Sequence, residues 1–180
     1  MRRTMIGLML VAGCASSGAV EGSDSTPKQA AIFSSSETGL LMAERPRAAA
    51  TTLTASPPNV WLAVKKVYAD LEIPITVDNV AAHQIGNANF YRSRQLAGEP
   101  MNLFVDCGSG MTGPKAATYR IYASLLTDVN PDGKGGTKLQ TTFVPIGQDV
   151  AGGSTDRIPC GSTGRFELLF LDRVKAAVSK

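Results

Sequence analysis

The two stretches Thr118-Tyr-Arg-Ile-Tyr-Ala-Ser-Leu125 and Lys138-Leu-Gln-Thr-Thr-Phe143 decide the fold of this 180-residue chain. In each stretch, residues suited to a core alternate with polar or charged ones, which is the period of a β-strand with one buried face. The connector from Asn130 to Gly136 contains Pro131 and three glycines, as a turn does. The sequence therefore predicts an antiparallel hairpin at the centre of the fold.

Shorter strands are expected on both sides of this hairpin. Each is a short run of apolar or alternating residues bounded by glycine, proline or polar residues. The predicted strands are Ala50–Ala55, Ile75–Val77, Gly86–Arg92 and Leu103–Cys107.

Two helices complete the predicted domain. Ser56 is a suitable N-cap with Pro57 at the first helical position, and the helix that follows is apolar on one face until Pro74 stops it. A second helix begins near Ser162 or Thr163 and runs through the C-terminus. We therefore expect a single α+β domain over residues 49–180, a helix-grip-like antiparallel sheet of four to six strands with both helices packed on one face.

The N-terminus has the pattern of an export signal. Arg2 and Arg3 precede an apolar run that is too short to span a bilayer as a helix. The run ends in Val11-Ala12-Gly13-Cys14, which resembles the lipobox of bacterial lipoprotein precursors. The resemblance implies that residues 1–13 are a signal peptide and that Cys14 becomes acylated after cleavage. An ordinary secretory signal with a coincidental cysteine is the alternative.

The predicted anchor carries an expected location. Residues 14–48 are rich in Ser, Gly, Ala and Thr and read as an acylated, flexible tether. Ala15 follows the cysteine where the inner-membrane retention signal of such lipoproteins is typically Asp. The resemblance thus implies a lipid anchor in the cell envelope, in the outer membrane and facing the periplasm, with the bilayer as a partner.

Cys107 and Cys160 are expected to be oxidised after export. A bridge between them would close a loop of about 50 residues and stabilise the fold by roughly 3–4 kcal/mol. Two separate buried thiols are the alternative. A zinc site is not expected, because His83 is the only histidine and leaves too few soft ligands.

No set of residues in the sequence supports catalysis. Asp128-Val-Asn-Pro-Asp-Gly133 opens like a calcium loop, but Leu139 stands where a bidentate Glu belongs, so a plain turn is favoured over a weak calcium site. The sequence contains no Gly-x-Ser-x-Gly nucleophile elbow whose serine His83 could activate as a base. We expect neither an enzyme nor a cofactor or metal.

Charge excludes one class of partner. The chain has 18 basic and 15 acidic residues, and removal of Arg2 and Arg3 leaves 16 against 15. The basic residues are also scattered, whereas nucleic-acid binding needs a clustered basic patch. No nucleic-acid partner is expected.

The order of elements resembles that of the helix-grip domains of the BamC family, which are accessory lipoproteins of β-barrel assembly machinery. In this order a helix is followed by antiparallel strands and a C-terminal helix, and all of them come after the lipobox-like stretch and the tether. This resemblance covers residues 50–180 in element order, without a diagnostic motif, and implies an envelope interaction or assembly module that binds a protein partner. The alternative function is binding of a small apolar ligand or lipid in a groove near Trp61, Phe143 and Phe166.

Overall fold

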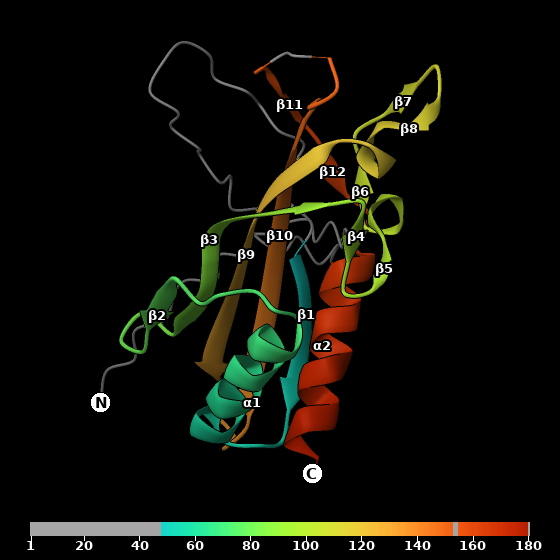
Figure 1. The fold of residues 1–180 in the computed structure, drawn as a ribbon. Helices are drawn as coiled ribbons and strands as arrows, with labels where there is room; N and C mark the ends of the chain where they lie inside the picture. The colour runs from blue at the N-terminus through green and yellow to red at the C-terminus, as the bar shows by residue number, and fades with distance from the viewer. Residues whose placement is uncertain (1–47, 153–154, 180) are drawn as a thin grey trace, which may run out of the picture.

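An antiparallel sheet of six strands carries the fold in the computed structural model, which describes residues 48–152 and 155–179 (Figure 1). The strand order is β1-β10-β9-β3-β2, and β11 pairs with β10 beyond the end of β1. The sheet thus confirms the predicted α+β class and strand number. Its strands are β1 (Ala48–Leu53), β2 (Val77–Asn79), β3 (Gln84–Ser93), β9 (Arg120–Pro131), β10 (Thr137–Gln148) and β11 (Arg157–Pro159).

The predicted central hairpin is formed by β9 and β10, in continuous register from Arg120 opposite Gln148 to Pro131 opposite Thr137. In the connector, Asp132 Oδ1 accepts hydrogen bonds from the backbone N–H groups of Lys134 (2.7 Å) and Gly136 (2.8 Å). The acidic residue that suggested a calcium loop therefore stabilises a turn.

The two helices are α1 (Pro57–Asp70) and α2 (Arg165–Val178). Helix α1 begins as predicted, with Pro57 in its first turn after an extended Ser56. Helix α2 begins two or three residues later than predicted. Gly164 before it is left-handed (φ 82°), and the Thr163 hydroxyl donates to the Leu103 carbonyl, which holds this segment outside the helix.

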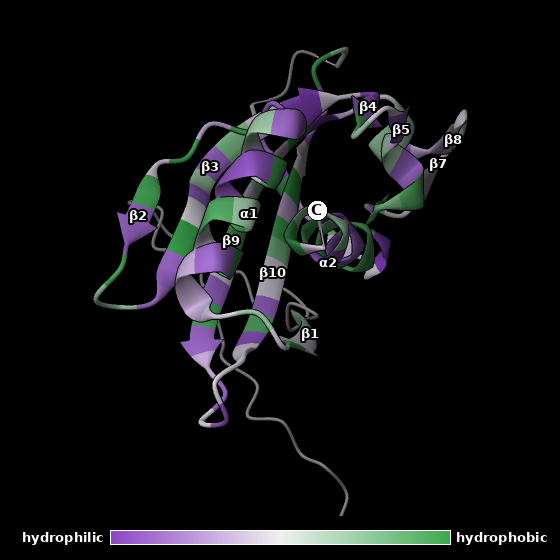
Figure 2. Cartoon of the chain, turned by 90° about the horizontal axis from the view of Figure 1, so that it is seen from below, coloured by the Kyte–Doolittle hydropathy of each residue, from purple (hydrophilic) through white to green (hydrophobic). Residues whose placement is uncertain are grey.

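Both helices pack on the same face of the sheet, as predicted. From α1, the Tyr68 hydroxyl donates to the Leu125 carbonyl at 3.0 Å. From α2, the Phe166 ring centroid lies 4.9 Å from that of Phe143. Leu125 and Phe143 are directly opposite one another in the hairpin, so they project from one face. Figure 2 shows the alternation of apolar and polar residues along β9 and β10 that makes this face apolar.

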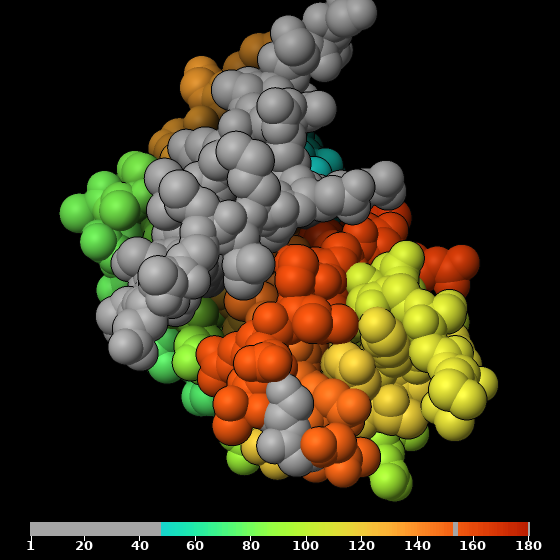
Figure 3. Space-filling model, turned by 90° about the horizontal axis from the view of Figure 1, so that it is seen from above, coloured from blue at the N-terminus to red at the C-terminus, as the bar shows by residue number. Residues whose placement is uncertain are grey.

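A small lobe packs at one end of the sheet, where segments near residues 105–118 and 155–165 lie together (Figure 3). A disulfide joins Cys107 to Cys160 within it, as predicted, with an S–S distance of 2.04 Å. The lobe comprises β4 (Gln95–Leu96), β5 (Glu99–Pro100), η1 (Met101–Leu103), β6 (Val105–Asp106), β7 (Ser109–Gly110), β8 (Gly113–Pro114), η2 (Lys115–Ala117) and β12 (Gly161–Ser162).

The predicted strand Leu103–Cys107 is wrong in its first half, because Leu103 ends the 3₁₀ helix η1 and strand pairing is confined to Val105–Asp106. Phe104 and Val105 are adjacent yet both buried, at 3% and 1% exposure. A regular strand sends adjacent side chains to opposite faces, so this double burial requires a local departure from it.

Two edge strands are displaced from their predicted positions by two residues. Strand β1 ends at Leu53 rather than Ala55, because Leu53 pairs with Thr137, where β10 begins. Strand β2 begins at Val77, which pairs with Gly86, so its pairing starts where the predicted strand ended. In both cases the partner strand determines the boundary.

Candidate interaction surface

The three residues of the predicted apolar groove do not surround an opening. Phe143 and Phe166 are buried, at 1% and 0% exposure, and their rings contact each other. On its other side Phe166 meets Phe104, with ring centroids 5.4 Å apart. Trp61 lies half-buried on α1, and no ring contact among the described residues joins it to the other two. Large side chains thus fill the space between the sheet and α2.

Two clefts open on the surface at other places. One of about 310 Å³ lies between α1 and the end of α2, and its lining consists of Ala55, Asn59, Leu62, Ala63, Lys66, Ala177 and Val178. The other, of about 440 Å³, is lined by Asp70, Leu71, Glu72, Arg92, Gln95, Leu96, Ala97, Gly98 and Arg173. Neither lining includes a residue of the predicted groove.

The sheet face opposite the helices holds a more distinctive arrangement. Tyr122 lies three residues from Leu125 on β9, so it projects from this outer face. The strand register then aligns side chains in rows across four strands. One row is Ser93, Arg120, Gln148 and Arg157, and the neighbouring row is Tyr91, Tyr122, Ile146 and Pro159. A polar, cationic row therefore lies beside an aromatic and apolar one.

Four residues of these rows contact one another, and we call Tyr91, Arg120, Tyr122 and Arg157 the Tyr–Arg patch. The Arg157 guanidinium carbon lies 4.0 Å from the centre of the Tyr122 ring, and that of Arg120 lies 5.5 Å from the centre of the Tyr91 ring. The two tyrosine rings are 6.0 Å apart at 48°. Each cation thus stands over an aromatic face, an attraction worth about 0.5–1 kcal/mol at an exposed site.

The electrostatics of the patch show how closely its groups are coupled. Hydrogen bonding from Arg120 lowers the pKa of the Tyr122 phenol, and the nearby charge of Arg157 acts in the same direction. The same contact with Tyr122 raises the pKa of Arg120. Lys65, Lys66 and Lys175 form ion pairs with aspartates, and none of these three pairs includes a patch arginine.

The buried carboxylate of Glu167 has a structural explanation. It is fully buried in the first turn of α2, and the Ser162 hydroxyl lies 2.7 and 2.8 Å from its two oxygens. The same hydroxyl accepts from the Gly164 N–H at 3.1 Å. A carboxylate here is favoured by the helix N-terminus and joins α2 to β12.

The described residues contain neither a metal-binding cluster nor a membrane-spanning helix. No cluster of three or more His, Cys, Asp or Glu side chains there is placed to hold a metal ion. Neither α1 nor α2, nor either 3₁₀ helix in that part of the chain, has the length and hydropathy of a membrane-spanning helix.

Sequence reasoning did not identify the patch. Arg120 and Tyr122 occupied the outward positions of the predicted hairpin, but nothing local joined them to Tyr91 or Arg157. Those contacts depend on β3 and β11 pairing with the hairpin. The sequence did contain one signal of a binding surface, which is an arginine and an aromatic residue at alternate outward positions of one strand.

The predicted lipidation residue Cys14 lies outside the described residues. No protein-family model matches the sequence, and no curated protein matches it either.

Proposed function

We propose that the protein is a membrane-anchored lipoprotein of the bacterial envelope, that it acts as a non-catalytic interaction module, and that it binds a protein partner through the Tyr–Arg patch. The observation that carries this proposal is the patch itself. Tyrosine and arginine are enriched among the residues that dominate protein–protein binding energy. Here two of each lie together on one exposed surface, and Tyr91 is 60% exposed.

The strands beneath the patch favour recognition without large rearrangement. Strands β9 and β10 pair over their whole length, and β3 and β11 flank them. Contacts between the four side chains restrict their rotamers before a partner arrives. A preorganised surface loses less conformational entropy on binding.

On the β3 side of the patch the edge of the sheet is protected, which favours the face over this edge as the binding surface. At β3, the Ala88 N–H donates to Thr76 Oγ1 and the Asn89 N–H donates to Asn87 Oδ1. The Tyr91 carbonyl accepts from its neighbour Arg92. These side chains occupy backbone groups that an added strand would need.

The alternative function, binding of an apolar ligand between the sheet and α2, has less support. Phe143 and Phe166 pack against each other there and leave no open lining. An interior filled by large side chains suits a binding module that presents a surface.

In-cell photocrosslinking of the full chain tests the proposed function. A photoreactive phenylalanine replaces Tyr91 in the patch, and in the control it replaces Leu62, which is similarly exposed (66%) but lies on α1. We expect a discrete protein adduct from position 91 that is absent from position 62. Equal adducts at both positions, or none at position 91, would refute binding through the patch.

The anchor has a separate test. Cys14→Ser removes the thiol that the lipobox resemblance assigns to acylation. We expect loss of labelling by radioactive palmitate and release of the protein from the membrane fraction. Unchanged labelling would refute the anchor and leave the binding function intact.

A further inference from the structure

We propose that the Tyr–Arg patch recognises a carboxylate of an acidic segment of the protein partner, with an apolar residue of that segment on the neighbouring row. This inference rests on the proposed function and specifies the chemistry of its partner.

Convergence of the two arginines is the first argument. Arg120 and Arg157 come from different strands, and Gln148 is the register partner of both. Arg157 nevertheless lies over the Tyr122 ring and Arg120 over the Tyr91 ring, and the centres of these two rings are only 6.0 Å apart. Two cations thus stand over one pair of adjacent tyrosine rings on the surface. Guanidinium groups bind carboxylates through strong, charge-assisted hydrogen bonds.

The use of nearby carboxylates within the chain is the second argument. Asp128 projects from the same face, but it lies six residues from Tyr122 along β9, roughly 20 Å away, and accepts from Gln84. Asp149 accepts from the backbone N–H groups of Ala151 and Gly152. The hydrogen bonds of these two carboxylates are thus made with groups outside the patch.

The composition of the neighbouring row distinguishes an acidic peptide from inorganic polyphosphate. Tyr91, Tyr122, Ile146 and Pro159 form an apolar border next to the arginines. A chain of phosphates has no group to place on such a border. Binding to a phosphate polymer also depends on many basic residues, whereas this patch has two. An acidic segment with one apolar side chain matches both rows.

The test measures peptide binding to the full chain in nanodiscs of neutral phosphatidylcholine. The probe is a fluorescent peptide with three glutamates around one phenylalanine, and its match has glutamine in place of each glutamate. We expect the glutamate peptide to bind roughly tenfold more tightly than its match. We also expect Arg120→Gln and Arg157→Gln each to weaken the glutamate peptide several-fold, while Lys66→Gln on α1 leaves it unchanged.

Three outcomes would overturn this inference. They are equal affinity for the two peptides, no binding of the glutamate peptide at millimolar concentration, and unchanged binding by both arginine variants when circular dichroism shows them folded. A competition arm adds inorganic phosphate and, separately, vesicles containing phosphatidylglycerol. Displacement of the peptide by either one more effectively than by free glutamate would assign the patch to phosphate chemistry instead.

The outcomes separate this inference from the proposed function. A crosslinked partner at position 91 together with equal binding of the two peptides would retain the binding module and reject the acidic chemistry. Selective binding of the glutamate peptide without a crosslinked partner would reject the proposed function and retain an anion site.

Discussion

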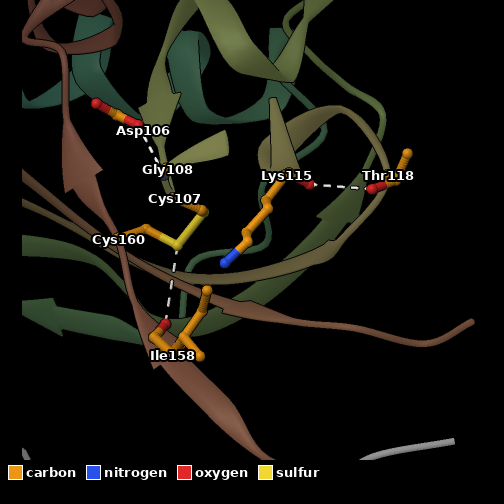
Figure 4. The surroundings of a disulfide bond; sticks show 7 residues. All are labelled: Asp106, Cys107, Gly108, Lys115, Thr118, Ile158 and Cys160. Carbon is orange, nitrogen blue, oxygen red and sulfur yellow. Dashed lines mark hydrogen bonds between the residues drawn. A yellow bond between two sulfur atoms is a disulfide. The ribbon is translucent and has the colours of Figure 1, made fainter. Parts of the chain in front are cut away.

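The disulfide between Cys107 and Cys160 is expected to contribute substantially to the stability of the domain, and one pair of substitutions can remove it. It joins residues 53 positions apart and ties β6 to β12 (Figure 4). The perturbation is reduction of the native protein, compared with the double variant Cys107→Ala/Cys160→Ala. Reduction removes the covalent bond and keeps both sulfur atoms, whereas the double variant removes both.

The magnitude follows from loop closure. For a loop of 53 residues, the entropy that the bridge removes from the unfolded chain is about 14 cal/mol/K, or about 4 kcal/mol at 25 °C. The sulfur atoms also pack closely, since a Cβ added at Gly147 would lie 2.9 Å from Cys160 Sγ and 3.2 Å from Cys107 Sγ. Their removal should cost about 1 kcal/mol more. For a domain of this size, about 4 kcal/mol is a large part of the free energy of unfolding.

Urea unfolding followed by circular dichroism measures both effects. We expect oxidised native protein to exceed reduced protein by about 3–4 kcal/mol in free energy of unfolding, and reductant to leave the double variant unchanged. Gly147→Ala provides a coupled control. It should destabilise the oxidised protein through contact with the two sulfurs and cost less in the double variant, where those atoms are absent.

Two results would refute this reasoning. A loss below about 1 kcal/mol on reduction would mean that the loop is already restricted in the unfolded chain, and the entropy argument would fail. An equal cost of Gly147→Ala in both backgrounds would mean that the sulfur atoms do not limit the space beside β10.

Three further predictions concern the core. Tyr68→Phe should lower the free energy of unfolding by about 1–3 kcal/mol, because the buried hydroxyl bonds to the Leu125 carbonyl and Thr127 Oγ1; an unchanged urea midpoint would contradict this. Burial raises the pKa of the Tyr68 phenol above the usual 10.0, so its contribution to the free energy of unfolding is complete below pH 10 and is lost as pH rises toward the folded-state value. The stability of Tyr68→Phe, measured from pH 9 to 11, should therefore fall less steeply than that of the native protein. Parallel curves would contradict this prediction. Ser162→Ala should cost about 1.5–3 kcal/mol by removing a donor to the buried Glu167 carboxylate, measured by thermal unfolding, with Ser179→Ala at the exposed end of α2 as a nearly neutral control.

Local pattern was sufficient for the main elements of the fold. Alternation predicted the β9–β10 hairpin, and Pro57 and Pro74 marked the limits of the segment that contains α1. These signals are local, because strand period and helix caps depend on neighbouring residues. Edge strands were less accurate, since β1 and β2 begin or end where their partner strands do.

Some of the predicted site residues could likewise be assigned from the sequence, whereas others depended on the tertiary structure. Cys107 and Cys160 could be paired from their number and expected compartment, and the structure joins them. Phe143 and Phe166 were recognisable as apolar but not as mutual partners, because their contact depends on how α2 packs across the sheet. Sequence pattern alone cannot say whether two buried rings fill a core or line a groove.

By itself, then, the sequence determined the α+β class, the central hairpin and the helices, and it indicated the cysteine pair. It also contains Val11-Ala12-Gly13-Cys14, whose resemblance to a lipobox is the basis of the proposed anchor. Only the tertiary structure decided that Tyr91, Arg120, Tyr122 and Arg157 form one patch. The physical reason is strand register. Residues from three strands, far apart in the chain, become neighbours only when β3 and β11 pair with the hairpin in one particular alignment.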